Sequence, residues 1–375
     1  MRIPLGPPLR RASVSVLALA AVWAPGTARA TAPAAPPSPE APRIPFAERY
    51  HAVQRGGIVR AANASVSCRT TADDPAGTPE PADPAQPPCE AARAGRFPAV
   101  NGDFDMSYVD VDDDPDTYNS SRAEVRLPEG ARVTYARLYW GGNLLAGEQK
   151  PAADDGRVLV AEPGGRYKEL LADTVVGHRT ENGADAFQAS AEITDLVRSS
   201  GSGLWTVGQV NIAKGRSGPG AWGGWTLVVA YRNPAEPLRT LALWDGFDSL
   251  DRATEVRLNG LRVPRGAGGR VGLVAYNGDR GGTGDSLTCS VAGRIPTALA
   301  DSTGPADDVL DSTINDPGPV RARREPAYDN TLGYDSDVFD LGTALAQGGD
   351  QLTFRLVSQR DAAWAGALFA AVDVQ

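Results

Sequence analysis

The sequence predicts an all-β fold, a β-sandwich or jelly roll, and three observations point to it. From about Phe97 onward, short runs of β-branched, aromatic and aliphatic residues alternate with clusters of Gly, Pro, Asn and Asp, which is typical of strands separated by turns. The 42 Gly and 30 Pro lie mostly between those runs, where tight turns need them. Helical periodicity is scarce, which disfavours a parallel α/β sheet because its crossovers need helices.

The apolar runs place the strands in order along the chain. We expect strands at 104–109, 123–127, 132–140, 157–161, 187–193, 205–212, 225–232, 239–247, 254–258, 271–276, 286–291, 352–358 and 367–374. Single helical turns are expected at 194–199 and at 341–346.

The length favours two related sandwich units packed together, at 51–232 and 238–375. A weak internal echo supports this, because 191–231 and 337–372 both read as a helical turn, a strand, a loop and a closing strand. The two stretches would then be a duplicated jelly-roll half, and chance similarity between β segments is the alternative. The boundary would lie near Asn233 to Pro237, where Asn-Pro-Ala-Glu-Pro separates two strong strands.

The first thirty residues predict export. Arg2, Arg10 and Arg11 precede a ten-residue apolar stretch at 14–23, and Ala28-Arg29-Ala30 is a small-x-small cleavage site. We expect cleavage after Ala30 and a secreted protein; an uncleaved anchor is disfavoured because about 20 apolar residues are needed to cross a bilayer. The Ala/Pro-rich composition that follows predicts an extended linker over 31–50.

The charge balance excludes some partners. The chain has 37 basic and 46 acidic residues, and the signal contains four arginines and no acid, so removing it leaves 33 against 46, a net charge of −13. An acidic protein is a poor partner for nucleic acid or anionic lipid. We expect no nucleic acid and no membrane insertion, and the charge is compatible with divalent cations.

Three cysteines fit an exported chain. Cys68 and Cys89 flank a Pro- and Asp-rich stretch, and we expect a disulfide between them, worth about 3 kcal/mol in the chain-entropy model. Cys289 is left over, either buried and inert or a free thiol.

Several segments from about Val100 to the end resemble, as an ordered set, the amino-terminal head region of large bacterial surface proteins common in actinobacteria. The segments are Asn119–Ser121 with Ala123–Pro128, Ala136–Gly142, Gly224–Tyr231, Asp245–Phe247, Gly278-Asp279 with Gly284–Ser286, and Gly333–Asp337. The resemblance implies an extracellular, β-rich, non-catalytic module with adhesive or structural use, and it supplies no ligand. The tandem β-sandwich repeats and the cell-wall anchor that usually follow in such proteins are missing here, which puts covalent attachment to the wall in doubt.

Alternating carboxylates make calcium the expected cofactor. Asp110, Asp112, Asp114 and Asp116 occur at every second position, which is how calcium loops gather hard oxygen ligands. The EF-hand pattern is not met, because Pro115 stands where its loop needs Gly. A second candidate is the pair Asp335 and Asp337, near Asp329. The alternative for both is a solvated acidic turn.

Two tryptophans could form a sugar platform. Trp222 and Trp364 lie in Gly/Ala-rich stretches that read as loops, where they could be exposed, and an exposed Trp can stack on a sugar ring. The alternative is that each is tucked onto the sheet. The one basic run, Arg321-Ala-Arg-Arg324, predicts an exposed, protease-sensitive loop, with an acidic partner as the alternative.

Catalytic motifs are weak. Gly284-Asp-Ser-Leu287 spells a lipase signature, but the only histidines are His51 and His178, so no His follows Ser286 to act as its base. A glycoside hydrolase needs only two carboxylates, and acids are plentiful. We therefore expect a non-catalytic, calcium-stabilised surface protein that binds a cell-surface, matrix or protein partner. A carbohydrate-binding module is the second alternative, and a carboxylate-based glycoside hydrolase is the third.

Overall fold

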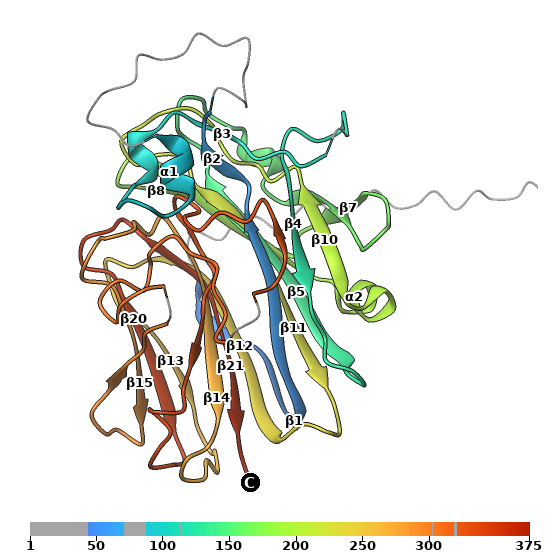
Figure 1. Cartoon of the computed structure of the whole chain (residues 1–375), viewed down its shortest axis with the longest axis vertical. Coiled ribbons are helices and arrows are strands. Elements are labelled where there is room, and N and C mark those ends of the chain that lie inside the picture. Colours follow the sequence, from blue (N-terminus) through green and yellow to red (C-terminus); the bar gives the residue numbers. More distant parts are fainter. Residues whose placement is uncertain (1–43, 71–87, 113, 302, 319–320) are drawn as a thin grey trace, which may run out of the picture. The chain divides into compact units, whose positions relative to one another are not determined.

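The structure of the protein, a computed structural model, describes residues 44–70, 88–112, 114–301, 303–318 and 321–375 (Figure 1). The predicted signal peptide and the Ala/Pro-rich residues up to Arg43 lie outside these ranges. Within them the regular elements are almost all strands, and every pair of named strands is antiparallel. The prediction of an all-β sandwich fold is confirmed. No helix in the described ranges has the length and apolar character needed to cross a bilayer.

One long network of paired strands organises the molecule. Its order is β18-β14-β21-β12-β1-β11-β5-β9-β8, with β19 pairing to β14 beside β18. The strands are β1 (Ile44–Ala64), β5 (Arg132–Asn143), β8 (Thr174–Glu181), β9 (Ala184–Glu192), β11 (Gly223–Arg232), β12 (Leu238–Ser249), β14 (Gly269–Tyr276), β18 (Tyr334–Asp335), β19 (Val338–Asp340) and β21 (Trp364–Asp373).

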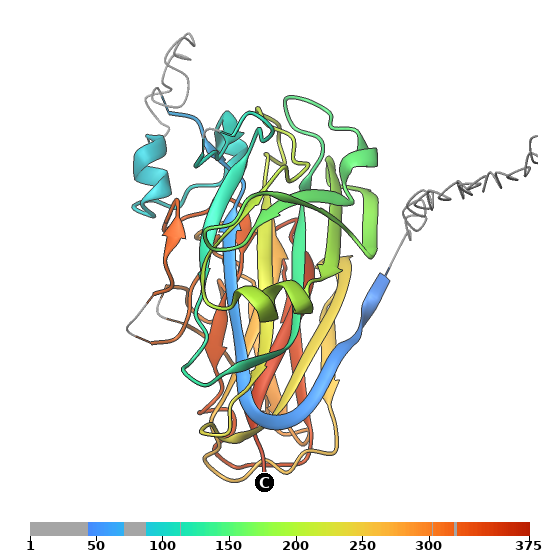
Figure 2. The same ribbon diagram turned by 90° about the vertical axis from the view of Figure 1, so that its right-hand side faces the viewer.

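Strand β1 bends in its middle and divides this network in two. Its residues 44–55 pair with β12, and its residues 56–64 pair with β11. Figure 2 shows the bend as a U in blue. We call the part with β12, β21, β14, β18 and β19 the β12 sheet, and the part with β11, β5, β9 and β8 the β11 sheet. Tyr139 of β5 and Phe247 of β12 belong to one buried apolar cluster, so the two sheets pack against each other.

Two smaller sheets cover the outer faces. The five-stranded sheet has the order β17 (Arg324–Glu325), β4 (Ser120–Val125), β10 (Gly203–Gly208), β6 (Arg157–Ala161) and β7 (Lys168–Leu171). The four-stranded sheet has the order β13 (Thr254–Leu258), β20 (Leu352–Val357), β15 (Ser286–Val291) and β16 (Thr297–Ala298). The remaining elements are β2 (Val66–Cys68), which pairs with β3 (Met106–Tyr108), the helices α1 (Cys89–Arg93) and α2 (Thr194–Ser200), and 3-10 turns at Asn101–Asp103 and Ala152–Asp154.

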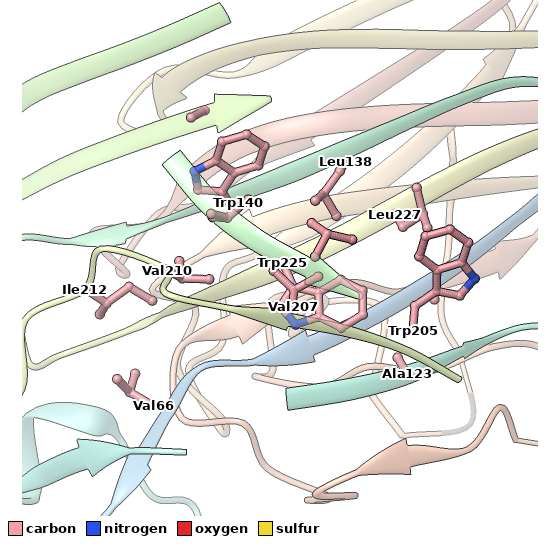
Figure 3. Packing of buried hydrophobic residues seen from close by; sticks show 14 of the residues in the cluster. Val66, Ala123, Leu138, Trp140, Trp205, Val207, Val210, Ile212, Trp225 and Leu227 are labelled. Carbon is pink, nitrogen blue, oxygen red and sulfur yellow. The ribbon is translucent and has the colours of Figure 1, made fainter. Parts of the chain in front are cut away.

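Both faces of each large sheet are buried, and the period of two along the strands explains how. On β5, Leu138 and Trp140 belong to the same buried cluster as Trp205 of β10, in the core under the five-stranded sheet (Figure 3). The intervening Tyr139 faces the β12 sheet. On β12, Trp244 likewise packs under the four-stranded sheet. The result is two sandwiches placed back to back.

The same strand topology occurs in both sandwiches. The outer sheets contain β4-β10-β6 in one and β13-β20-β15 in the other, and the inner sheets contain β11-β5-β9 and β21-β14-β19. The strands also occur in the same order along the chain: β4, β5, β6, β9, β10 and β11 in one sandwich correspond to β13, β14, β15, β19, β20 and β21 in the other. This arrangement agrees with the predicted internal duplication, in which β10 and β11 correspond to β20 and β21.

The linker prediction for 31–50 was wrong at its end, because β1 begins at Ile44. Residues 44–55 also belong to the β12 sheet, so the second sandwich takes its edge from the start of the chain. The strand was missed because charged residues such as Glu48 and Arg49 interrupt its apolar positions. One of them is neutralised across the strand pair, since Arg49 Nε lies 2.9 Å from Asp245 Oδ2 on β12.

The expected disulfide is confirmed. Cys68 of β2 bonds to Cys89 of α1 with 5.7 Å between their Cα atoms. Cys289 is free and buried in the core of the second sandwich, and burial raises the pKa of its thiol to about 12. It is therefore the inert thiol of the two alternatives.

The bend of β1 depends on Gly56. Its φ is +146°, and a Cβ built there would lie 2.0 Å from the Tyr231 carbonyl oxygen. Gly56→Ala should therefore destabilise the fold by roughly 2 kcal/mol or more, through backbone strain and the clash. Gly218→Ala is the matched control, because its Cβ would meet no atom within 4 Å. Urea unfolding of both variants checks this, and equal midpoints for the two would contradict it.

Candidate metal centre

The segment Tyr334–Asp337 carries two carboxylates on one face. Tyr334 and Ser336 point towards the β11 sheet, where Thr226 Oγ1 lies 2.7 Å from Tyr334 Oη and 3.1 Å from Ser336 Oγ. Because side chains alternate along an extended chain, Asp335 and Asp337 point the other way. The hydrogen bonds to Thr226 fix the orientation of both carboxylates.

A third carboxylate meets them from the segment that follows β16. One oxygen from each of Asp311, Asp335 and Asp337 lies within 4.8 Å of the others. We call these three residues the aspartate centre. Their side chains are buried, with 3, 0 and 1% of the residue surface exposed. Three carboxylates therefore share a site that water hardly reaches.

Thr313 and the backbone beside it hold the centre in place. The Thr313 hydroxyl lies 2.7 Å from Asp311 Oδ1 and 3.0 Å from Asp337 Oδ1. The Asn315 amide donates to Asp337 Oδ1 at 2.7 Å, and the Thr313 amide donates to Asp335 Oδ1 at 3.3 Å. These donors occupy one oxygen of each carboxylate. The Oδ2 atoms of Asp335 and Asp337 are buried and have no hydrogen-bond partner.

The electrostatics of the centre are unfavourable without a cation. Burial first, and then the charges of its neighbours, raise the pKa of Asp335 and of Asp337 well above the ordinary value. Burial also raises the pKa of Asp311. Among the described residues no Lys, Arg or His forms an ion pair with any of the three. Buried charges of one sign must be protonated or bind a metal.

The donor set suits a hard divalent cation. Calcium takes six to eight oxygen ligands at about 2.3–2.6 Å, so two ligands on opposite sides of the ion are about 5 Å apart. The three carboxylate oxygens lie within 4.8 Å of one another, which is inside that distance. No sulfur or imidazole contributes, which disfavours zinc. Asp311, Asp335 and Asp337 could hold calcium, with backbone or water oxygens completing the shell.

A second group of carboxylates lies beside the centre, in the loops at 278–285, 307–308 and 359–361. We call Asp279, Asp285, Asp308 and Asp361 the acidic rim. Burial first, together with the charge of Asp361, raises the pKa of Asp285 to about 8, of Asp279 to about 7 and of Asp308 to about 6. The charge of Asp311 also raises the pKa of Asp308, so the rim and the centre are electrostatically linked.

Backbone amides satisfy only part of the rim. Gly281 N donates to Asp308 Oδ2 at 2.9 Å, and Asp279 N donates to Asp361 Oδ2 at 3.1 Å. Asp285 interacts with the side chains of Ser358 and Asp361, whereas Asp308 Oδ1 and Asp279 Oδ1 are buried without a hydrogen-bond partner. The raised pKa values mean that ionising these carboxyls beside the centre is unfavourable.

A surface pocket of about 220 Å³ reaches both groups. Asp308 of the rim and Asp311 of the centre line it, together with Arg280 and the half-exposed Phe97. A cation could enter the aspartate centre through this pocket.

The four described aspartates of the run at 110–116 do not converge. In the described part of the chain, only the aspartate centre brings three carboxylates into ligand range. Asp112 Oδ2 instead accepts from Tyr167 Oη at 2.6 Å, and its Oδ1 accepts from Asp114 N at 3.1 Å. Asp114 Oδ1 accepts from Asp116 N at 3.0 Å, and Asp110 Oδ1 accepts from Ser120 Oγ at 2.7 Å. The geometry is that of an acidic turn, the alternative reading of this run.

The prediction that two tryptophans form a sugar-binding surface was wrong. Trp222 and Trp364 are 0 and 1% exposed and lie in the cluster between the two large sheets. Trp364 stacks on Phe247 with ring centroids 5.1 Å apart, and Trp222 lies 6.0 Å from Tyr276. The Gly/Ala-rich residues that suggested loops belong to strands or lie where two backbones pack closely. Both indoles are therefore buried, and neither can reach a ligand.

Sequence reasoning missed Asp311. It placed Asp335 and Asp337 near Asp329, but Asp329 is exposed and pairs with Arg321 at 3.1 Å. Asp311 comes from a segment with no regular structure, and only the tertiary fold brings it to the pair. The short run of acids at Asp307, Asp308 and Asp311 was the one available signal.

No protein-family model matches this sequence, and no curated protein matches it. Three solved structures show a weak likeness over 68% of the chain. One is from the atomic structure of Sulfolobus turreted icosahedral virus (9% identity, 86% of that chain, TM-score 0.20). The others are recombinant N-glycanase F (11%, 89%, TM-score 0.18) and a peptide-N(4)-(N-acetyl-β-D-glucosaminyl) asparagine amidase (10%, 90%, TM-score 0.19). At these TM-scores the likenesses carry no argument.

Proposed function

We propose that this chain is an exported, non-catalytic surface protein that binds Ca²⁺ at Asp311, Asp335 and Asp337. The ion locks the irregular segment around Asp311 onto β18 and β19, so that the loops at this end of the sandwich present a fixed surface. That surface binds a cell-surface, matrix or protein partner. The resemblance to surface-protein head regions supports the role, and the Cys68–Cys89 disulfide supports an oxidising compartment.

One observation carries the calcium part of the proposal. Three buried carboxylates meet within 4.8 Å, and no basic side chain among the described residues pairs with them. Leaving such charges unpaired inside a protein costs several kcal/mol per ion. A bound cation supplies the compensating charge, and calcium is present at millimolar concentration outside cells, where modules with Kd values of about 10⁻⁴–10⁻³ M operate.

A carboxylate-based hydrolase has one observation in its favour, the position of Asp308 and Asp311 in the wall of a pocket. The volume of about 220 Å³ is smaller than the roughly 300–1,000 Å³ of common small-molecule sites. Asp335 and Asp337 are completely covered and cannot approach a substrate. The non-catalytic role therefore remains our proposal.

Isothermal titration with CaCl₂ tests the metal site directly. The disulfide-bonded protein, freed of cations with chelator, should bind Ca²⁺ saturably, and Asp311→Asn should weaken that binding at least tenfold by removing a charged ligand. Asp340→Asn is the matched control, because Asp340 is an exposed carboxylate on the neighbouring strand β19 and should leave the affinity unchanged. Absence of saturable binding in the unsubstituted protein would refute calcium as the cofactor.

A further inference from the structure

Two arginines from distant parts of the chain line one cavity on the five-stranded side, Arg60 buried and Arg324 partly buried. Arg60 lies on β1, and its side chain is 2% exposed. Arg324 begins β17, the edge strand that pairs with β4. Burial, followed by the charge of Arg60, lowers the pKa of Arg324 to about 10. Two guanidinium groups of like charge are therefore held close together with little water around them.

The protein satisfies these guanidinium groups only in part. Arg60 Nη2 donates to the Asn315 carbonyl at 2.8 Å, and Arg324 Nη2 donates to the Tyr328 carbonyl at 2.9 Å. Arg60 Nε and Arg324 Nη1 are buried and have no hydrogen-bond partner. A buried donor without an acceptor is costly, more so when it is charged.

A cavity of about 80 Å³ lies between the two groups. Arg60, Arg321 and Arg324 line it with Asp316 and Asp329, so basic side chains exceed acidic ones in its wall. Arg321 Nη1 forms an ion pair with Asp329 Oδ1 at 3.1 Å, and Arg60 Nη1 lies 3.5 Å from Asp316 Oδ2. Among the described residues no carboxylate forms an ion pair with Arg324, although the charges of Asp329 and Asp337 act on it. The space exceeds the roughly 10–15 Å³ that one water needs.

The position of Arg324 is fixed independently of any ligand. Asn63 of β1 is 1% exposed, and its Nδ2 donates to the carbonyls of Glu325 and Pro326, each at 3.0 Å, and to that of Arg122 at 2.9 Å. These bonds attach the segment after Arg324 to the same strand that carries Arg60. The two guanidinium groups are thus preorganised.

We propose that the cavity between Arg60 and Arg324 binds a small tetrahedral oxyanion of the sulfate or phosphate class. The planar guanidinium fork matches the oxygens of such an anion, and Arg60 and Arg324 both line the cavity. The anion supplies the acceptors that Arg60 Nε and Arg324 Nη1 lack. It joins the segment that carries Arg324 to β1, beside the aspartate centre, whose Asp337 acts through its charge on both Arg60 and Arg324.

Isothermal titration with sodium sulfate, in chloride buffer of matched ionic strength, tests the site. The unsubstituted protein should give saturable one-to-one binding, and Arg324→Gln should reduce the affinity at least tenfold. The matched control is Arg323→Gln, which removes the neighbouring exposed charge paired with Glu325 and should bind like the unsubstituted protein.

Arg324→Lys covers the case in which Arg324→Gln fails to fold. It keeps the charge and loses the fork, so we expect weaker sulfate binding in a folded protein. The proposal is overturned if the unsubstituted protein shows no saturable sulfate binding, or if Arg323→Gln loses as much affinity as the Arg324 variants. Equal affinity for Arg324→Lys and the unsubstituted protein would also overturn it, because the guanidinium would then contribute nothing.

Discussion

Asp337→Asn is expected to destabilise the protein when calcium is bound and to stabilise it when calcium is removed. In saturating calcium the variant should melt several degrees below the unsubstituted protein. A ligand at about 100 times its Kd stabilises the folded state by roughly 2.7 kcal/mol, and the variant loses most of this. In chelator at about pH 8 the variant should melt above the unsubstituted protein, because it removes a buried charge that no cation then compensates.

The local geometry makes the substitution suitable for this test. Asp337 Oδ1 accepts from Asn315 N and from Thr313 Oγ1, and an asparagine keeps that acceptor. Asp337 Oδ2 has no hydrogen-bond partner, so the substitution removes the charge without breaking a hydrogen bond at that atom. Differential scanning calorimetry in both buffers, with Asp340→Asn as control, measures the effect. A variant that is less stable in both buffers would show that Asp337 acts only as a hydrogen-bond acceptor.

The fold class and many strands followed from periodicity and turn residues alone. The strands β13 at Thr254–Leu258 and β15 at Ser286–Val291 occur where the apolar runs predicted them. β1 was missed because its two arms are interrupted by charges that are neutralised only across strands, as Arg49 is by Asp245. A single sequence contains no signal for such long-range compensation.

The candidate site was predictable in part. The alternation of Asp335 and Asp337 puts both carboxylates on one face in any extended chain, so the pair could be found. Their burial and the third ligand could not be found in this way, because Asp311 lies in an irregular segment and reaches them only through the tertiary fold. The run of aspartates that includes Asp112 looked stronger by spacing, yet its carboxylates cap turns and accept from Tyr167. Spacing along the chain predicts convergence only where the backbone conformation is also known.

The stability of the chelated protein should fall as the pH rises from about 4 to about 8. Asp308, Asp279 and Asp285 have folded pKa values of about 6, 7 and 8, and burial is the first cause of each. In the unfolded chain these groups titrate near pH 4. Across that interval the folded state therefore holds protons that the unfolded state releases, and stability decreases with pH. The contribution is fully present below the unfolded pKa and is gone above the folded value.

Calcium should flatten this dependence or reverse it, because the ion binds more tightly as the carboxylates of the aspartate centre ionise. Its charge also acts on the rim, which is electrostatically linked to the centre through Asp308 and Asp311. Urea midpoints across the interval, in chelator and in calcium, measure both curves. Asp285→Asn should reduce the slope in chelator, since each raised carboxyl contributes at most about 1.4 kcal/mol per pH unit. Asp251→Asn, an exposed carboxyl after β12, should leave the slope unchanged. A chelated protein with equal stability at both ends of the interval would mean that solvent reaches the rim and that its charges are not buried.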